Sequence, residues 1–304
     1  MSRDTVLVTG AAGRMGVFLV PALQSSGWRV RALVHRRPVP AADEIVRGDL
    51  LDPEGLVAAT RGVRAVLHGA GVTHARRKRQ YAAINVHGTE ALIRAAERVG
   101  VERFLLVSTH ALGDDGGAYS DSKRRAEEVV VAGSVPFTIV RLPEVYGAGG
   151  EGIDRMVAAA RAGRWIPLVG AGADEVRPAR IDEIADALVR ALGAPCAAGR
   201  IYTLAGHALS IREVAEASIA AFRSGSRLVP LPEQLVRLAG HLSRALPLPL
   251  YPDQLTRLRA RRAEPSTAAA AELGFRPRPF AEGIRWAEAD ACASASRSRR
   301  RSPP

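Results

Sequence analysis

Short apolar runs alternate with segments of helical periodicity over roughly the first half of the chain. The runs predict strands at Thr5–Val8, Val30–Val34, Ile45–Val46, Ala65–Leu67, Phe104–Val107 and Phe137–Val140. They contain consecutive Val, Ile and Leu rather than an alternation of apolar and polar residues, which is typical of parallel strands buried on both faces. Helices are predicted between them, at Met15–Ser25, Gln80–Arg98 and Ser122–Val131. We therefore expect an α/β fold with a doubly wound parallel sheet.

The regular alternation ends after Tyr146-Gly147. Later segments predict helices at Ile153–Arg161 and Asp182–Leu192, strands at Ile201–Leu204 and Leu228–Pro230, and a helix opened by the capping box Ser210–Glu213. We predict a Rossmann-type dinucleotide-binding domain over residues 1–147. A smaller α/β substrate-binding cap is predicted over 148–288, with segments that return to the Rossmann sheet, and a disordered basic tail over 289–304.

The composition narrows the class of protein. Apolar residues make up 47% and charged residues 24%, which indicates a globular chain. Cys196 and Cys292 form no paired motif, so we expect a cytoplasmic protein with neither a disulfide framework nor a metal site. No signal peptide and no transmembrane segment are predicted. The net charge of +12 favours an anionic ligand, but the chain carries no nucleic-acid-binding motif, so nucleic acid is not an expected partner.

A glycine-rich turn joins the first strand to the first helix. The segment from Thr9 to Gly16 reads TGAAGRMG. Glycines in this position allow a tight turn, a close approach of the backbone to a pyrophosphate, and close packing of the helix on the sheet. The free N–H groups of the helix N-terminus favour the phosphates. We expect a dinucleotide to contact Gly10, Gly13, Arg14, Met15 and Gly16.

The ends of the second and third strands bear on the choice of cofactor. Proteins that bind NAD usually place an acidic residue at the end of the second strand, on the ribose hydroxyls. Here the chain reads Val34-His35-Arg36-Arg37, and arginine at this point suits the 2′-phosphate of NADP. We therefore favour NADP over NAD, with Arg36 as the contact. Asp49 is expected to accept a hydrogen bond from the adenine amino group, and Leu50 beside it is expected to contact the cofactor.

A tyrosine and a lysine four residues apart form the candidate catalytic pair. Tyr119 and Lys123 lie on one face of the predicted helix, close behind Ser108 at the end of the fifth strand. A tyrosine hydroxyl has an ordinary pKa near 10, and a nearby ammonium brings it towards the working range of an acid or base. The chain has only two lysines among 43 basic residues, so a lysine at this position departs from its own composition. Ser108 is expected to hold the substrate oxygen beside Tyr119.

Three of these segments resemble the extended short-chain dehydrogenases/reductases: the TGxxGxxG turn, the YxxxK pair of Tyr119 and Lys123, and the segment RLPEVYG from Arg141 to Gly147. Shorter matches occur at His68–Gly71, Asn85–Thr89, Arg177–Ala185 and Leu273–Ile284. The resemblance covers about residues 4–287 and is strongest to the nucleoside-diphosphate-sugar epimerase/dehydratase branch.

The resemblance implies roles for individual residues. Ser108, Tyr119 and Lys123 would be the catalytic set, with Tyr119 and Lys123 also contacting the cofactor. Asn85 would support the active-site hydrogen bonds, Ala70 would line the cofactor cleft, and Pro143 would lie near the nicotinamide. Thr109 would contact the substrate, and Arg177 would bind its diphosphate. Many relatives form dimers, which makes a homodimer an expectation at the level of the fold.

The sequence departs from the family pattern at two places. The acid after the second strand is absent, and Thr109-His110 stands where sugar dehydratases carry Asp-Glu, so dehydration is disfavoured.

The sequence leaves three alternative functions open. The first alternative is an NAD(P)-dependent epimerase or reductase of a nucleotide sugar. The second is an NADPH-dependent reductase of an apolar ketone, steroid-like or flavonoid-like. The third is a non-catalytic scaffold that binds NADP, against which the intact Ser108, Tyr119 and Lys123 argue.

Overall fold

A computed structural model describes residues 4–37, 42–75, 77–113, 116–147, 149, 150, 152–242 and 264–285. Its largest sheet has seven strands in the order β11-β6-β5-β4-β1-β2-β3, and every neighbouring pair is parallel. The strands are β1 (Thr5–Thr9), β2 (Arg29–Val34), β3 (Glu44–Arg47), β4 (Ala65–His68), β5 (Arg103–Thr109), β6 (Phe137–Leu142) and β11 (Arg200–Thr203). The predicted doubly wound α/β sheet is confirmed.

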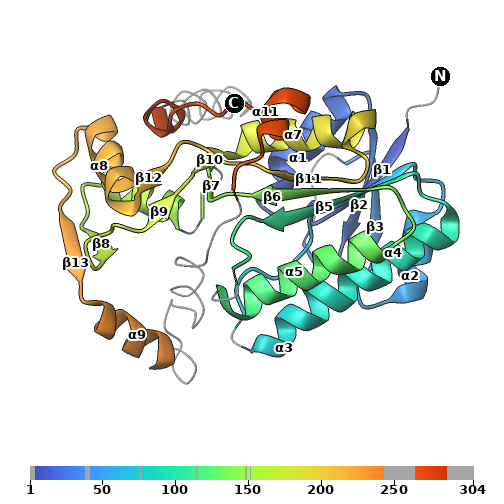
Figure 1. Ribbon diagram of the computed structural model, residues 1–304, viewed down its shortest axis with the longest axis horizontal. Coiled ribbons are helices and arrows are strands. Elements are labelled where there is room, and N and C mark those ends of the chain that lie inside the picture. The colour runs from blue at the N-terminus through green and yellow to red at the C-terminus, as the bar shows by residue number, and fades with distance from the viewer. Residues whose placement is uncertain are drawn as a thin grey trace, which may run out of the picture. The chain divides into compact units, whose positions relative to one another are not determined.

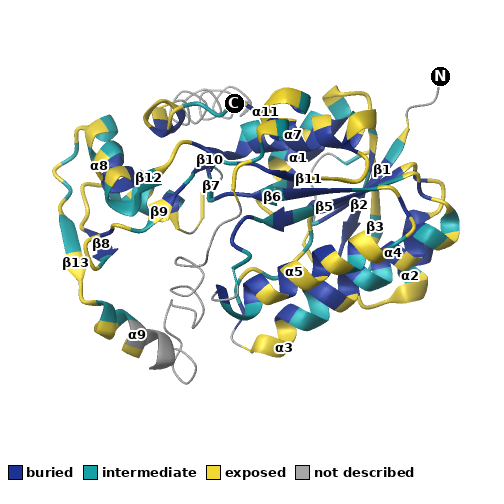
Figure 2. Ribbon diagram, viewed as in Figure 1, coloured by how far each residue is buried: buried dark blue, intermediate teal, exposed yellow. Residues whose placement is uncertain are grey.

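Helices cover both faces of this sheet (Figure 1). One face carries α2 (Pro53–Thr60), α4 (Gly88–Val99) and α5 (Gly117–Ala132), and the other carries α1 (Gly16–Ser25) and α7 (Ile181–Gly193). The central strands are therefore mostly buried, as Figure 2 shows, and Val6, Leu7 and Val8 of β1 have no exposed surface. This double burial explains why these strands contain consecutive apolar residues.

The long helix predicted over Gln80–Arg98 is interrupted. The chain forms α3 (Lys78–Tyr81), then a π-helix over Ala82–His87, and only then α4. Inside the π-helix, the Asn85 side chain exchanges two hydrogen bonds with the backbone of Val72, accepting from N at 2.8 Å and donating to O at 3.0 Å. We attribute the wider turn to this anchoring, because a π-bulge inserts a residue and redirects the side chains beside it.

The chain divides into two compact units. The first contains residues 1–143, 182–204 and 237–276, and the second contains 144–181, 205–236 and 277–304. The predicted domain limits at 147 and 288 stay predictions, and the predicted disordered tail over 289–304 lies outside the described residues. Among the described helices, none combines the length and apolar character needed to cross a membrane.

The second unit has a small core of its own. It contains α6 (Ile153–Arg161) and α8 (Ile211–Phe222), which pack with the parallel pair β8 (Ile166–Val169) and β13 (Leu228–Leu231). The predicted capping box opens α8, with Ser210 accepting from the Glu213 N–H at 3.1 Å. The second unit also contains β7 (Val145–Tyr146), β9 (Glu175–Val176), β10 (Ala179–Arg180) and β12 (Leu209–Ser210). The 3₁₀ turn Pro195–Ala197 and α11 (Thr267–Glu272) belong to the first unit, and α9 (Glu233–Leu242) spans the limit between the two.

Candidate cofactor and active site

A cavity of about 440 Å³ lies where four neighbouring strands end. Residues at and beyond the carboxyl ends of β1, β2, β3 and β4 line it. In an open parallel sheet, ligands bind outside the carboxyl ends of the strands, at the point where the strand order reverses. That reversal falls between β1 and β4 here, so the sheet topology places a ligand at this cavity.

Six of the predicted cofactor contacts line this cavity: Gly10, Gly13, Arg36, Asp49, Leu50 and Ala70. Gly10 has φ +78°, and a Cβ atom there would come within 2.6 Å of the Gly69 carbonyl carbon, so only glycine fits this turn. At Gly16 a Cβ atom would overlap the Ala11 carbonyl oxygen at 1.8 Å, so glycine is needed there for packing; its predicted contact with the cofactor stays a prediction. Arg14 and Met15 do not line the cavity, and their contacts stay predictions.

The sequence did not identify the apolar wall of the cavity, which Leu33, Val72 and Ile84 provide. Arg36 and Arg37 add two exposed cations at the end of β2, and Asp49 lies 3.4 Å from the His35 ring. An apolar wall with a basic rim and a glycine turn fits the adenosine and phosphates of a dinucleotide. In the sequence, the only indication of this apolar wall is that Leu33 lies in the second strand, just before the basic turn.

The buried side chain of His68 links the glycine turn to α4. The His68 Nδ1 atom lies 2.7 Å from the Thr9 hydroxyl, and Nε2 lies 2.9 Å from the Thr89 hydroxyl. Thr89 donates its proton to Asn85 O at 2.7 Å, so it accepts from Nε2–H. Nδ1 is then the acceptor, and Thr9 donates to it while accepting from the Ala70 N–H at 3.1 Å. These bonds assign a neutral ring protonated on Nε2.

Asn85 continues this hydrogen-bonded chain to the helix that carries the candidate catalytic pair. Its Nδ2 atom donates to the Ser122 hydroxyl at 2.9 Å, and Ser122 donates to Tyr119 O at 2.7 Å. Asn85 thus joins the loop after β4 to α5. Its predicted support of catalysis stays a prediction.

Tyr119 is almost buried in α5, with 9% of its surface exposed. Its ring meets the Tyr81 ring edge to face at 5.9 Å, and it packs in a cluster with Val72, Ala75 and Ala118. The Tyr81 hydroxyl accepts a hydrogen bond from the Ala75 N–H at 2.9 Å, which fixes Tyr81 in place. The described side chains that pack against Tyr119 in this cluster are therefore apolar or aromatic.

Lys123 is buried one helical turn after Tyr119, and its Nζ atom donates to Val107 O at 2.7 Å. Burial lowers the pKa of Lys123 to about 8, and the carboxylate of Glu127 acts in the opposite direction. Burial, with a smaller effect of the Lys123 charge, lowers the pKa of His68 to about 3. Near neutral pH, His68 is therefore neutral, and Lys123 loses its proton far more easily than an exposed lysine does.

The two hydroxyls at the end of β5 have different partners. Ser108 is buried and donates to Glu127 Oε1 at 2.5 Å. Thr109 is half-buried and accepts from the Ala111 N–H at 3.3 Å. The predicted contacts of Ser108 and Thr109 with substrate stay predictions, and so does the predicted place of Pro143 beside the nicotinamide. In the second unit, Arg177 forms an ion pair with Glu175 at 2.9 Å, and its predicted contact with a diphosphate also stays a prediction.

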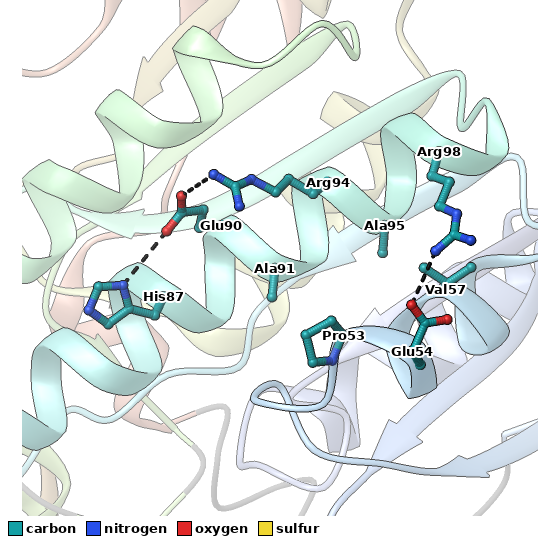
Figure 3. A pocket seen from close by; sticks show the side chains of 9 residues that line it. All are labelled: Pro53, Glu54, Val57, His87, Glu90, Ala91, Arg94, Ala95 and Arg98. Atoms are coloured by element: carbon teal, nitrogen blue, oxygen red, sulfur yellow. Dashed lines mark hydrogen bonds and ion pairs between the residues drawn. The ribbon is translucent and has the colours of Figure 1, made fainter.

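A second cavity of about 310 Å³ lies over α2 and α4 (Figure 3). Its charged side chains pair with one another: Glu90 with Arg94 at 2.6 Å, and Glu54 with Arg98 at 3.2 Å. His87 faces this cavity, although it belongs to the Asn85–Thr89 segment that resembles the family. None of the predicted site residues lines it, whereas six of the predicted cofactor contacts line the first cavity.

Comparison with known proteins decides the family. The sequence model of the NAD dependent epimerase/dehydratase family matches residues 6–205. The chain belongs to this family. Membership confirms the resemblance to the extended short-chain dehydrogenases/reductases and the prediction of a nicotinamide cofactor.

Relatives and a solved structure add detail. A ceramide reductase of Caulobacter vibrioides is 38% identical over 154 residues, which is 49% of this chain and 48% of that protein. A 2-alkyl-3-oxoalkanoate reductase of Stenotrophomonas maltophilia is 30% identical over 71% of this chain and 75% of that protein. The chain therefore matches only about half the length of the ceramide reductase. MoeE5 in complex with UDP-glucose and NAD shares the fold, with a TM-score of 0.74, 24% identity, and coverage of 95% of this chain and 100% of MoeE5.

Proposed function

We propose that the protein is an NADP(H)-dependent oxidoreductase that interconverts a ketone and a secondary alcohol on an apolar, lipid-like substrate. The observation that carries the proposal is the buried Tyr119–Lys123 pair, in which the Tyr119 ring packs against apolar side chains that include Val72 of the dinucleotide cavity. An apolar setting favours a substrate with little polar surface around its carbonyl group. The ceramide reductase and the oxoalkanoate reductase, whose names describe lipid substrates, support the same class.

The chain's own residues would divide the work as follows. The bound nicotinamide supplies the hydride for the carbonyl carbon. Tyr119 would give its proton to the carbonyl oxygen in the same step, and in the reverse direction it would take that proton back. Lys123 would stabilise the phenolate left on Tyr119, because a cation in a buried site acts strongly on a neighbouring charge.

Arg36 and Arg37 support NADP over NAD. Both line the cavity at the end of β2, where an acid would repel a 2′-phosphate. A guanidinium forms charge-assisted and often bidentate hydrogen bonds with phosphate. Glycines 10 and 13 would let the backbone approach the pyrophosphate.

Substrate-dependent NADPH oxidation by the purified protein tests the proposal. A 3-ketosteroid, a long-chain 3-oxo acid ester and a set of UDP-sugars would be compared as substrates. We expect turnover with an apolar ketone, and Tyr119→Phe should lower it by about 10²- to 10⁴-fold while NADPH still binds. Tyr202→Phe is the matched control, because it removes another buried tyrosine hydroxyl, which donates to Glu272 at 2.5 Å within the same unit.

A nucleotide-sugar epimerase is the second candidate. The segment around Arg177 favours it, because this arginine stands where sugar-nucleotide members of the family bind a diphosphate. The same preparation separates the two candidates. Tightly bound NAD(H) in the purified protein, with interconversion of UDP-sugars and no net consumption of NADPH, would replace the ketone reductase with the epimerase.

A further inference from the structure

Three side chains spaced four residues apart lie on one face of α5: Tyr119, Lys123 and Glu127. Only the first two have a part in the proposed reaction. Glu127 is 5% exposed, and a buried carboxylate needs partners that compensate for its lost hydration. The contacts of Glu127 therefore call for an explanation beyond helix packing.

Glu127 contacts two neighbouring strands at once. It accepts from the Ser108 hydroxyl of β5 at 2.5 Å, and from Arg141 of β6 at 2.6 Å through Nη2 and 3.1 Å through Nε. Ser108 and Arg141 face each other in the parallel register of these strands. One turn earlier, Lys123 donates to Val107 O. The end of β5 is thus fixed to α5 at two successive residues.

We infer that Glu127 is a positioning residue for the proposed reaction: it engages the Ser108 hydroxyl within the protein and places a buried carboxylate one helical turn from Lys123. The inference rests on the proposed function for its kinetic part. The Ser108 hydroxyl would then fix the end of β5 to α5 through Glu127. Thr109, in place of Ser108, would contact the substrate. The Thr109 hydroxyl accepts at 3.3 Å from Ala111 N–H, which leaves its proton for a substrate oxygen.

The charges around Lys123 determine the direction of the effect. On α5 these are Tyr119 and the carboxylate of Glu127. On β4, His68 is neutral. On β6, Arg141 forms an ion pair with Glu127. Glu127 raises the pKa of Lys123 against the effect of burial. Removing its charge would release the first proton of the Tyr119–Lys123 pair at lower pH, whichever residue loses it.

The pH dependence of Tyr119 ionisation tests this without any substrate. Phenolate absorbance is titrated in the full chain, and the contribution of Tyr119 is obtained as the difference from Tyr119→Phe. We expect E127Q to lower the midpoint by about one pH unit. E128Q is the matched control, because Glu128 is exposed and pairs with Arg124 at 3.1 Å on the same helix. E127D keeps the carboxylate, so its midpoint should lie close to that of wild type.

Turnover supplies the second measurement. The alkaline limb of kcat should move with the midpoint in E127Q, and Thr109→Val should cost at least about tenfold more turnover than Ser108→Ala. Arg141→Gln removes the cation beside Glu127 and should move the midpoint upward, which keeps the inference testable if E127Q does not fold. Equal midpoints for E127Q and E128Q, or equal losses in the two hydroxyl variants, would overturn it. Absence of turnover with every ketone would count against the proposed function alone.

Discussion

Mild acidification should destabilise this protein through one side chain, His68. Both ring nitrogens are committed in the neutral form: Nδ1 accepts from Thr9, and Nε2–H donates to Thr89. A proton on Nδ1 would face the donor of Thr9 and lie in the field of Lys123. Burial first, and Lys123 second, accordingly lower the pKa of His68 from 6.5 to about 3.

The sign and size follow from proton linkage. The folded pKa lies below the unfolded one, so the unfolded chain takes up the proton first as the pH falls. The contribution of neutral His68 is complete above about pH 6.5 and is lost progressively down to about pH 3. At pH 5 the difference of about 1.5 units from the unfolded pKa corresponds to about 2 kcal/mol of unfolding free energy.

Urea unfolding at pH 7 and pH 5 measures this loss. His68→Gln removes the titration, and its amide can still donate to Thr89. We expect this variant to be less stable than wild type at pH 7 by about 1–3 kcal/mol, because Thr9 loses its acceptor. Its additional loss at pH 5 should be about 2 kcal/mol smaller than that of wild type. His87→Gln removes an exposed histidine and should behave as wild type. Equal losses in wild type and His68→Gln would refute the reasoning.

Three further substitutions test the site. Lys123→Arg should lower turnover by about 10²-fold or more, because a longer, planar guanidinium does not replace a compact ammonium beside Tyr119; a near-normal rate and pH profile would contradict the role of Lys123. Arg36→Ala should lower the preference for NADP over NAD by about tenfold, measured as the two Kd values at fixed low salt; a wild type that binds both equally would remove the argument for NADP. Gly10→Ala should weaken binding of both cofactors and destabilise the fold by more than about 1 kcal/mol, since φ is +78° and the added atom meets Gly69; unchanged Kd values would show that the turn can adapt.

The sheet and the glycine turn could be predicted because their causes are local in sequence. A strand covered on both faces must contain consecutive apolar residues, and a strand followed directly by a glycine turn and a helix leaves few other folds. The six strands predicted before residue 147 are all present, and the end of each differs from the prediction by no more than two residues. The candidate pair Tyr119 and Lys123 could be singled out because lysine is so rare in this chain.

Other features depend on partners that are distant in the sequence. The π-helix at Ala82–His87 is tied to Val72 by Asn85, and no periodicity in Gln80–Arg98 signals it. The direction of the Ser108 hydroxyl depends on Glu127, which the sequence shows only as one more charged residue on a helix. The paired strands β9 and β12 have two residues each, too few for a hydrophobic pattern.

The outermost strand of the large sheet has a consequence for synthesis of the protein. β11 pairs with β6, but it is encoded about sixty residues later, after the first segment of the second unit, residues 144–181. At roughly 5–20 residues per second, a ribosome would leave the N–H and C=O groups along β6 unpaired for about 3–12 s. During that interval a nascent chain carries an open strand edge, which is a template for pairing with another chain. Crowded polysomes, where several such chains emerge side by side, are therefore the setting in which this sequence is most exposed to misassembly.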